Sequence, residues 1–487
     1  MKRTKIICTI GPRTETEDGI RTLLEAGMDV ARLNGSHNTL EWHAATIARI
    51  RKVAPHVPIL LDIPGRKIRT HGLAHEPTFK AGEVIVLTTD TSHDGSNKVP
   101  VNYARLHEDL RAGHTILADD GTLRFTVERL DGQDIHCRAE TAGQLKSRKG
   151  INVPFVKLQN ALITERDQQM MGFVREHGVD FVGISFVESA AHVETIRELA
   201  GGDWPRIVSK IENQGGLDHM EEVIVATDAV MIDRGDLSVE TNLENLSLFQ
   251  KRIIAAAEQA AKPVIVATEM LHTMIANPVP TKAEVSDISN AVLDGCAATM
   301  LSGETAIGEF PFEAVRTMRR VADAAATYIH PDPRNGAGRA HVPHVMAEAI
   351  ALMCHSLPIT KIVAVTRSGY AARTIAARRP AQPILAVSDD LFGARSFNLL
   401  AGVEGVHLDL RFSRTSTDHV IHCLEALWRM GKIADEDMVL VTGIAYPRSG
   451  NRMNLLQTHV VGDLAETLNW RRAGASSNPR KLGVGHD

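Results

Sequence analysis

The sequence predicts an α/β protein: a (β/α)8 TIM barrel with an inserted small all-β domain, followed by a C-terminal α/β domain. Eight short apolar runs alternate with helical patterns at the spacing of βα units, as in a closed parallel barrel. The chain between the third and fourth runs is far longer than an ordinary βα connection. After Tyr328, a stretch rich in Pro and Gly separates a further set of alternating helices and strands.

The eight apolar runs are the expected barrel strands. They cover residues 5–10, 28–33, 58–62, 180–186, 206–211, 228–232, 263–268 and 298–302. One helix near the end of this series has clear boundaries, because Thr281 and Glu284 are spaced as a capping box and Gly295 stops the helix. We therefore assign residues 1–69 and 153–330 to the barrel.

Residues 70–152 are expected to form the insert, a small β-barrel-like domain. The runs at 82–88, 114–118, 123–127 and 134–138 show β-like alternation, with Asp-Gly and Gly-rich turns between them. Because the insert leaves the catalytic end of the barrel, it is suited to act as a lid.

The rest of the chain is predicted to contain a linker, a domain and a tail. Residues 331–343 are the expected linker, and residues 344–465 the C-terminal α/β domain, which is a candidate for effector binding. Its strands are expected at 361–366, 383–387, 405–410, 438–442 and 458–461. Residues 466–487 are predicted to be a disordered tail, since polar residues with Gly, Ser and Pro dominate from Arg471 onward.

The composition excludes several classes of function. Of 487 residues, 44% are hydrophobic and 23% charged, which is ordinary for a soluble protein of two or three domains. Lys and Arg number 54 against 59 Asp and Glu, so no nucleic-acid partner is expected. No signal segment or membrane span is recognisable. Five scattered cysteines without metal-ligand spacing indicate a reduced, cytoplasmic compartment.

Charged and polar side chains gather where the expected barrel strands end, which is where TIM barrels place their active sites. Lys210 and Glu212 are two residues apart and so share one face of their strand, and Asp236 follows the next strand. A cation beside two carboxylates that can share a divalent metal is typical of phosphate or enolate chemistry. The other candidates at strand ends are Arg32, Asn34, Ser36, His37, Asp62, Arg234, Thr268, Glu269, Ser302 and Glu304.

Each candidate taken alone also has a structural interpretation. Arg32 fits a salt bridge at the barrel rim, Asp236 fits a helix cap, and His37 fits a locally bonded histidine. Lys210 with Glu212 fits a structural ion pair. Two charges directed into a barrel mouth are costly unless they are used, however, so function is the favoured interpretation of this pair.

Several unusual strings agree in order and spacing with the pyruvate kinase family, which the chain resembles along nearly its whole length. The strings are TKIICTIGP at 4–12, GMDVARLNGSH at 27–37, SKIENQG at 209–215, RGDL at 234–237, ATEML at 267–271 and MLSGETA at 300–306. The resemblance implies a barrel A domain, an inserted B domain and a C-terminal domain. It also implies transfer of a phosphoryl group from phosphoenolpyruvate to ADP, giving pyruvate and ATP in glycolysis, by a homotetramer.

The resemblance further implies roles for the residues that match the family's motifs. The implied catalytic residues are Lys210, which would stabilise the moving phosphoryl group, Arg32, which would contact the phosphate, and Thr268. Glu212 and Asp236 would hold Mg²⁺ (or Mn²⁺), and Gly235 and Asp236 would position the substrate together with Thr268. The implied nucleotide contacts are Asn34, Ser36, His37, Arg69 and Lys149.

The loop after the third strand departs from the family's pattern. It reads Asp62-Ile-Pro-Gly-Arg-Lys-Ile-Arg69, where the family usually has Asp-Thr-Lys-Gly-Pro-Glu-Ile-Arg. Potassium-dependent members bind the ion through oxygens equivalent to Asn34, Ser36 and Asp62, with an acid at the place of Lys67. The Lys67 ammonium supplies the charge that potassium otherwise brings, so we expect activity without K⁺.

Three further departures are expected to affect turn geometry or lid closure rather than the reaction. Asp233 and Ser238 replace the family's usual small residues around the Arg-Gly-Asp motif, and Phe155 follows Pro154 where glycine is usual. In the C-terminal domain, residues 366–370 form a strand-to-helix turn where the resemblance places sugar-phosphate effectors and where an ordinary capped turn fits equally well. The loop at 447–452 offers two arginines and matches no effector class.

Two other functions stay open at this point. A barrel lyase that handles phosphoenolpyruvate with the same metal pair leaves the insert, Arg69 and Lys149 unexplained. A non-catalytic sensor of phosphorylated metabolites is disfavoured, because Lys210, Glu212 and Asp236 are all present.

Overall fold

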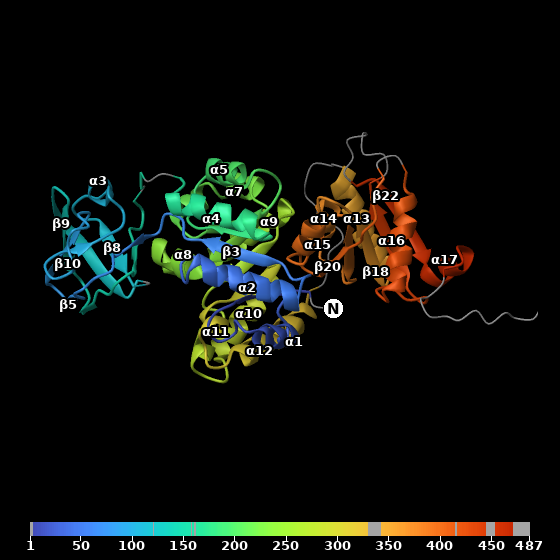
Figure 1. Cartoon of the computed structure of the whole chain (residues 1–487), viewed down its shortest axis with the longest axis horizontal. Coiled ribbons are helices and arrows are strands. Elements are labelled where there is room, and N and C mark those ends of the chain that lie inside the picture. Colours follow the sequence, from blue (N-terminus) through green and yellow to red (C-terminus); the bar gives the residue numbers. More distant parts are fainter. Residues whose placement is uncertain are drawn as a thin grey trace, which may run out of the picture. The chain divides into compact units, whose positions relative to one another are not determined.

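The structure of the chain is a computed structural model, which describes residues 3–119, 121–156, 158–159, 162–329, 342–413, 416–444 and 453–470. The chain divides into two compact units (Figure 1). One comprises Met1–His330 with Asn398–Gly402, and the other Pro331–Phe397 with Val403–Asp487. Within the described ranges, no helix has the length and apolar character that a membrane crossing requires.

Eight parallel strands close into a barrel in the first unit, in the order β1-β17-β16-β15-β14-β13-β3-β2. Their bounds are β1 (Lys5–Thr9), β2 (Val30–Asn34), β3 (Ile59–Ile63), β13 (Phe181–Ile184), β14 (Arg206–Ile211), β15 (Ala229–Asp233), β16 (Val264–Ala267) and β17 (Ala298–Leu301). All eight predicted strands are confirmed, with ends that differ by a residue or two, and so is the predicted fold class.

Helices surround the barrel strands (Figure 1). They are α1 (Glu17–Ala26), α2 (Leu40–Val53), α4 (Glu165–Glu176), α5 (Ala190–Ala200), α6 (Gln214–Asp218), α7 (Met220–Ala226), α8 (Arg234–Glu240), α9 (Leu246–Gln259), α10 (Lys282–Asp294), α11 (Gly303–Ala306) and α12 (Pro311–Ala326), with 3-10 turns η1 (Leu243–Asn245) and η2 (His272–Ile275). The predicted capping box of Thr281 and Glu284 begins α10, and Gly295 ends that helix in the left-handed conformation.

The alternation of side chains along each strand builds two cores around the barrel wall. On β1, Ile7 points into the barrel, where it packs with residues such as Val208 and Met231. Its neighbours Ile6 and Cys8 point outward into the layer of helices. The barrel interior is therefore filled, and a substrate site is confined to the ends of the strands.

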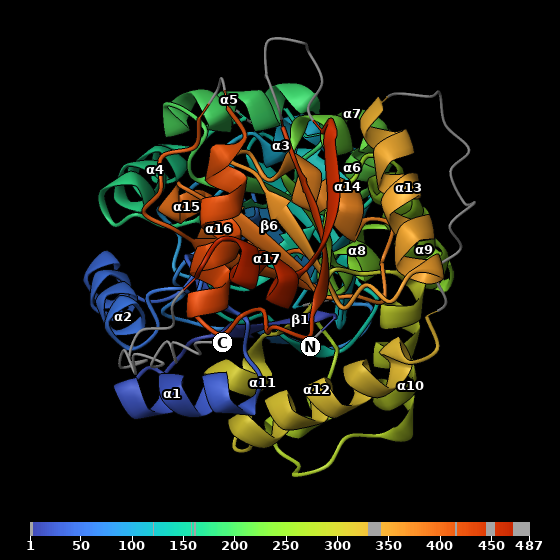
Figure 2. The ribbon, with the colours of Figure 1, turned by 90° about the vertical axis from the view of Figure 1, so that its right-hand side faces the viewer.

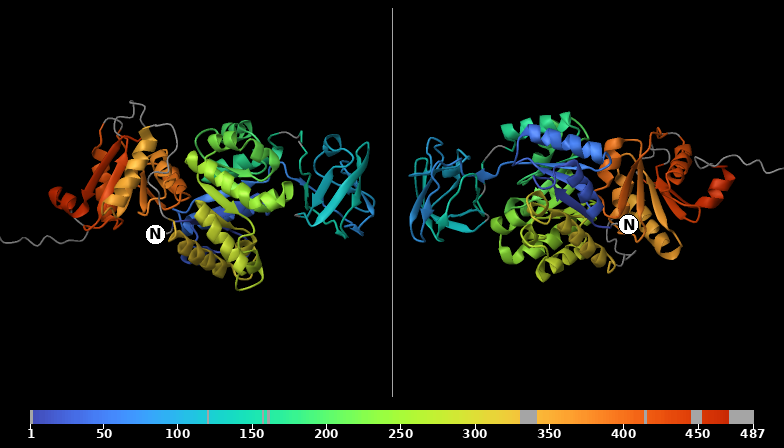
Figure 3. Two further views of the ribbon diagram at one scale, coloured as in Figure 1. Left: turned by 180° about the vertical axis from the view of Figure 1, so that it is seen from behind. Right: turned by 60° about the horizontal axis from the view of Figure 1, so that its bottom comes forward.

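The insert forms a sheet of its own between β3 and α4, drawn in cyan in Figure 3. Its strands are β4 (Ile68–Arg69), β5 (Thr78–Phe79), β6 (Val84–Thr88), β7 (Val99–Pro100), β8 (Thr115–Ala118), β9 (Leu123–Asp131), β10 (Asp134–Ala139), β11 (Gly143–Gln144) and β12 (Gly150–Asn152), with one short helix, α3 (Leu106–Asp109). Seven of these strands pair in the order β4-β12-β8-β9-β10-β6-β7. A bridge between Thr70 and Val101 links the two edge strands, so the sheet curls back on itself. The sheet begins at Ile68, slightly before the predicted boundary.

The second unit contains a five-stranded sheet in the order β20-β19-β18-β21-β22, parallel except for β22. Its elements are α13 (Val342–Ser356), β18 (Lys361–Val365), α14 (Tyr370–Ala376), β19 (Ile384–Ser388), α15 (Leu391–Phe397), β20 (Val403–His407), α16 (Asp418–Arg429), β21 (Met438–Gly443), β22 (Leu455–Val460) and α17 (Val461–Thr467). Helices α13 and α14 lie on the opposite side of the sheet from α16 (Figure 2). All five predicted strands are present.

The predicted linker and tail fall largely outside the described residues. Residues 330–341 and 471–487 belong to the undescribed part of the chain. Within the described part, α13 starts at Val342, inside the predicted linker. The predicted start of the tail at residue 466 is wrong by a few residues, because α17 runs to Thr467 and the ring of Trp470 lies 5.8 Å from that of Trp428.

Candidate active site

Three acidic side chains meet at the carboxyl ends of neighbouring barrel strands. Glu212 follows β14, Asp233 is the last residue of β15, and Asp236 lies in the first turn of α8. One carboxylate oxygen of each lies within 4.8 Å of the others. Glu212 and Asp233 are buried and Asp236 is half-buried. We call these three side chains the acidic cluster.

The Lys210 side chain enters the acidic cluster from β14. Its Nζ lies 3.0 Å from Glu212 Oε2 and 3.1 Å from Asp233 Oδ2. It also donates a hydrogen bond of 3.3 Å to the hydroxyl of Ser185, which follows β13. The structure thus brings Lys210, Glu212 and Asp236 together at one end of the barrel.

The charges in this cluster decide which groups stay ionised. Burial lowers the pKa of Lys210, but the adjacent carboxylates of Glu212 and Asp233 more than offset this, so that its pKa is raised and the ammonium stays charged. Burial raises the pKa of Glu212, against the opposing effect of Lys210. Burial acts in the same sense on Asp233, but Lys210 outweighs it and the pKa of Asp233 is lowered. Asp233 is therefore the carboxylate that remains ionised beside Lys210.

Two further cations stand at the edge of the cluster. Arg32 is buried and donates to Asp62 Oδ2 from Nε at 2.9 Å and from an outer nitrogen at 2.6 Å. The Lys67 ammonium lies 2.5 Å from Asp236 Oδ1. Asp62 is thus neutralised by Arg32, and Lys67 neutralises Asp236. With Lys210 and the other two acidic side chains, three cations face four carboxyl groups, so the site carries one net negative charge only when Glu212 is also ionised.

Thr268 lies on the far side of Asp233, directly after β16. Its hydroxyl accepts a hydrogen bond of 2.8 Å from the Gly235 N–H, and it lies 2.6 Å from Ala267 O and 3.2 Å from Asp233 Oδ1. The backbone at Thr268 is left-handed, with φ +66°. This conformation costs a β-branched residue about 1–2 kcal/mol, and such strain clusters at functional sites. Arg234 holds the strained turn by donating to Thr268 O at 2.9 Å.

The residues predicted to contact a nucleotide lie in two places. Asn34, Ser36 and His37 follow β2, where Asn34 Oδ1 accepts a bond from the Ser36 N–H. Burial lowers the pKa of His37, and the nearby guanidinium groups of Arg69 and Arg32 lower it further. Arg69 and Lys149 belong to the insert, where Arg69 pairs in register with Gly150, the residue after Lys149. Lys149 forms an ion pair of 2.7 Å with Asp119.

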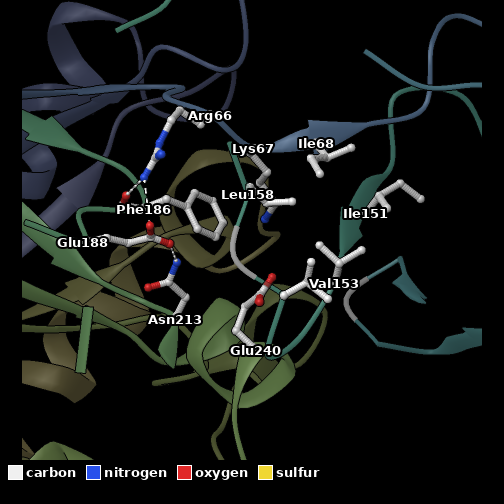
Figure 4. Close-up of a pocket in the computed structure, with 11 residues that line it drawn as sticks. Arg66, Lys67, Ile68, Ile151, Val153, Leu158, Phe186, Glu188, Asn213 and Glu240 are labelled. Carbon is white, nitrogen blue, oxygen red and sulfur yellow. Dashed lines mark hydrogen bonds and ion pairs between the residues drawn. The ribbon is translucent and has the colours of Figure 1, made fainter. Parts of the chain in front are cut away.

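A cavity of about 40 Å³ lies where the insert meets the barrel (Figure 4). Ile68, Ile151 and Val153 line it from the insert. From the barrel come Arg66, Phe186, Glu188, Asn213 and Glu240, among which Glu188 accepts from Asn213 at 2.6 Å and pairs with Arg66 at 3.4 Å. Glu240 accepts a bond of 2.6 Å from Asn152, the last residue of β12. Burial raises the pKa of Glu240 to about 7, although this hydrogen bond acts in the opposite sense.

Sequence reasoning missed several of these groups. Ser185 could have been found by the rule that active-site residues follow strand ends, since it follows β13 directly. Asp233 was noted only as a departure from the family's pattern, and nothing in its own sequence neighbourhood indicated contact with Lys210. No signal pointed to Glu240 or Asn152.

The acidic cluster fits a small divalent metal ion. Its donors are carboxylate oxygens, which Mg²⁺ and Mn²⁺ prefer. Glu212 Oε1 is committed to the Phe186 N–H at 2.7 Å, whereas the buried Oε2 atom has no hydrogen-bond partner and only the Lys210 ion pair. Within the described residues, the donor set contains no His or Cys.

The remaining predicted features are local. Residues 366–370 form a capped turn, in which Thr366 Oγ1 accepts from the Gly369 N–H and Arg367 pairs with Asp389. The loop at 447–452 lies outside the described residues. Phe155 is exposed and its backbone is left-handed, with φ +62°, which explains why glycine is usual there. Ser238 donates to Gly235 O at 2.8 Å.

The chain is similar to known proteins along nearly its whole length. The family model described as "Pyruvate kinase, barrel domain" matches residues 1–315, and "Pyruvate kinase, alpha/beta domain" matches residues 344–459. The pyruvate kinase of Sporosarcina psychrophila is 38% identical over 481 residues, which cover 95% of this chain and 81% of that protein. That of Geobacillus stearothermophilus is 38% identical over 482 residues with the same coverage. A crystal structure of a pyruvate kinase from Cryptosporidium parvum superposes with a TM-score of 0.85 at 32% identity, over 94% of this chain and 96% of that one.

Proposed function

The chain belongs to the pyruvate kinase family, whose members are phosphotransferases that require a divalent metal, and we propose that the acidic cluster around Lys210 is its active site. There a phosphoryl group passes from phosphoenolpyruvate to ADP, and the enolate that remains is protonated to pyruvate. The observation that carries this proposal is the Lys210 ammonium, held at 3.0–3.1 Å from two buried carboxylates at the barrel mouth.

The proposed roles follow from charge and position. Phosphoryl transfer requires positive charge around the migrating group and little covalent work by the protein. The Lys210 ammonium meets this need, because its raised pKa keeps it charged at any working pH. Arg32 is the second cation and contacts the phosphate, with Asp62 fixing the plane of its guanidinium.

The metal and substrate contacts surround this ammonium. Glu212 and Asp236 would hold Mg²⁺ (or Mn²⁺), which supplies positive charge to the phosphoryl and enolate oxygens when it is bound. The Thr268 hydroxyl and the backbone at Gly235 and Asp236 position the substrate. The Gly235 N–H donates a hydrogen bond of 2.8 Å to the Thr268 hydroxyl, which supports a shared role for these two residues.

The nucleotide is proposed to lie between the loop after β2 and the insert. Asn34, Ser36 and His37 form the barrel side of this site, and Arg69 and Lys149 contribute cationic groups from the insert. Because the two sides belong to different elements, closure of the insert would complete the site and exclude water, which suppresses hydrolysis of the phosphoryl group.

The test is formation of ATP from phosphoenolpyruvate and ADP by the wild-type protein and the Lys210→Met variant. Removing one charge-stabilising group from an active site costs about 100- to 1,000-fold in turnover, and we expect a loss of at least this size. Lys52→Met is the matched control, because it removes an exposed ammonium that pairs with Glu17 at the surface. Undiminished transfer by Lys210→Met would refute the assigned role.

The same assay separates the other candidates. A lyase would release a cleavage product without needing a nucleotide, and a sensor would bind phosphoenolpyruvate without turnover. We further propose that the protein is a cytoplasmic homotetramer that works in glycolysis. Size-exclusion chromatography with light scattering tests the oligomeric state.

A phosphorylated effector at residues 366–370 would have to displace Asp389 from Arg367.

A further inference from the structure

Asp233 contacts both the ammonium and the hydroxyl of the proposed active site, and none of the roles given above uses it. It ends β15, which lies between β14 and β16 in the barrel wall. Its Oδ2 atom is 3.1 Å from Lys210 Nζ on one side, and its Oδ1 atom is 3.2 Å from Thr268 Oγ1 on the other. The Asp233 side chain is only 10% exposed, so its orientation is fixed by the surrounding structure.

From these contacts we propose that Asp233 is a positioning residue, which holds the Lys210 ammonium and the Thr268 hydroxyl in place for phosphoryl transfer. The inference rests on the proposed function. Its physical basis is that one rigid carboxylate joins two groups from different strands. A misplacement of about 1 Å in such groups is enough to slow a reaction about 100-fold.

The other acidic residues of the cluster are already engaged. Glu212 Oε1 is bonded to the Phe186 N–H, so Lys210 and a divalent ion must share Oε2. Asp236 is paired with Lys67 at 2.5 Å. Among the residues that the structure describes, the ion pairs of Lys210 are with Glu212 and Asp233. Asp233 is thus the counter-charge that Lys210 keeps when Glu212 serves a metal.

The same contacts argue against Asp233 as a third metal ligand, although it belongs to the acidic cluster. Both of its oxygens have partners, the Lys210 ammonium and the Thr268 hydroxyl. To bind a metal, Asp233 would have to give up one of these two contacts. Glu212 Oε2 contacts Lys210 alone, and if a metal draws it away from Lys210, the ammonium still keeps its ion pair with Asp233.

The experiment compares wild type with Asp233→Asn and Asp233→Ala. It measures kcat and the KM for phosphoenolpyruvate, the Kd for Mn²⁺ of the substrate-free protein by electron paramagnetic resonance, and the melting temperature. We expect kcat to fall about 10- to 100-fold in both variants, while the Mn²⁺ affinity, the KM and the melting temperature stay close to those of the wild type. Asp18→Asn is the matched control, because it removes an exposed carboxylate that pairs with Arg21 on α1, and it is expected to leave kcat unchanged.

Three results would overturn the inference. An unchanged kcat in both variants would show that Lys210 and Thr268 need no such anchor. A loss of Mn²⁺ affinity of about tenfold or more would place Asp233 on the metal instead. If the melting temperature of both variants falls together with kcat, the role of Asp233 is merely structural. If the wild type itself forms no ATP, the proposed function is refuted. If the wild type is active and the Asp233 variants are equally active, only the inference about Asp233 is refuted.

Discussion

Lys67 shows how a single residue redirects the charges of the site. Its ammonium lies 2.5 Å from Asp236 Oδ1. Asp62, which the sequence analysis placed in the same monovalent-cation site as Lys67, is bonded to Arg32 instead. Asp62, which belongs to the predicted monovalent-cation site, is therefore neutralised by Arg32, and Asp236 is neutralised by Lys67. A permanent ammonium at this place would remove the need for an added ion, so independence of K⁺ remains our prediction.

The prediction is tested by replacing K⁺ with tetramethylammonium at constant ionic strength, with Mg²⁺ present. Wild-type turnover is expected to change by less than about twofold, while Lys67→Met is expected to lose about tenfold without K⁺, since about 1.4 kcal/mol of charge stabilisation corresponds to a factor of ten. Lys98→Met is the control, because it removes a comparable lysine that pairs with Asp134 within the insert. Wild-type turnover that disappears without K⁺ would show that Lys67 is not the substitute.

At the scale of elements, β12 of the insert is tied to α8 of the barrel by one hydrogen bond. Asn152 donates to Glu240 at 2.6 Å, beside the cavity of Figure 4. Burial raises the pKa of Glu240 to about 7, well above its ordinary value of 4.5. Between pH 4.5 and about 7, the folded protein therefore keeps a proton on Glu240 that the unfolded chain has released. The stability that this proton contributes is fully present below pH 4.5 and is lost as the pH rises through about 7.

Glu240→Gln is expected to remove this pH dependence. Relative to the variant, the wild type should lose about 2–3 kcal/mol of unfolding free energy between pH 4.5 and 7, which thermal melts across that range measure. Glu25→Gln is the control, because Glu25 is an exposed glutamate on α1. Parallel pH profiles for wild type and Glu240→Gln would contradict the raised pKa.

At the scale of the whole molecule, the proposed metal site is expected to couple metal binding to the stability of one unit. Three cations and four carboxyl groups meet there in the barrel unit, so a bound divalent cation would favour the ionised form of Glu212 and offset the repulsion among the carboxylates. The second unit has its own core, built on β18 to β21 and α16. Because the chain has two compact units, its unfolding is not expected to be a single transition.

Calorimetry with Mn²⁺ and with EDTA tests this coupling. At about 100 times its Kd, a ligand stabilises the folded state by about 2.7 kcal/mol, so the transition that contains the barrel should rise by a few degrees while the other stays. Glu212→Gln is expected to abolish the rise, and Glu25→Gln to keep it. An equal rise in Glu212→Gln would mean that the ion binds elsewhere.

Much of the fold and part of the site could be predicted from local sequence patterns. The eight barrel strands were found because each is a short apolar run between helical patterns, and the capping box of α10 was found because Thr281 and Glu284 lie three residues apart. Lys210, Glu212 and Asp236 were selected because parallel strands of a barrel end at one rim, and the structure does bring them together.

The pairing of these groups was decided by the tertiary structure. Lys67 and Asp236 are 169 residues apart, and Asn152 and Glu240 are 88 apart, so their contacts depend on how the insert returns to the barrel. Asp233 acquires its two partners only because β15 is placed between β14 and β16. Hydrophobic periodicity reports which face of an element is buried, but not which charged group of another element will meet it.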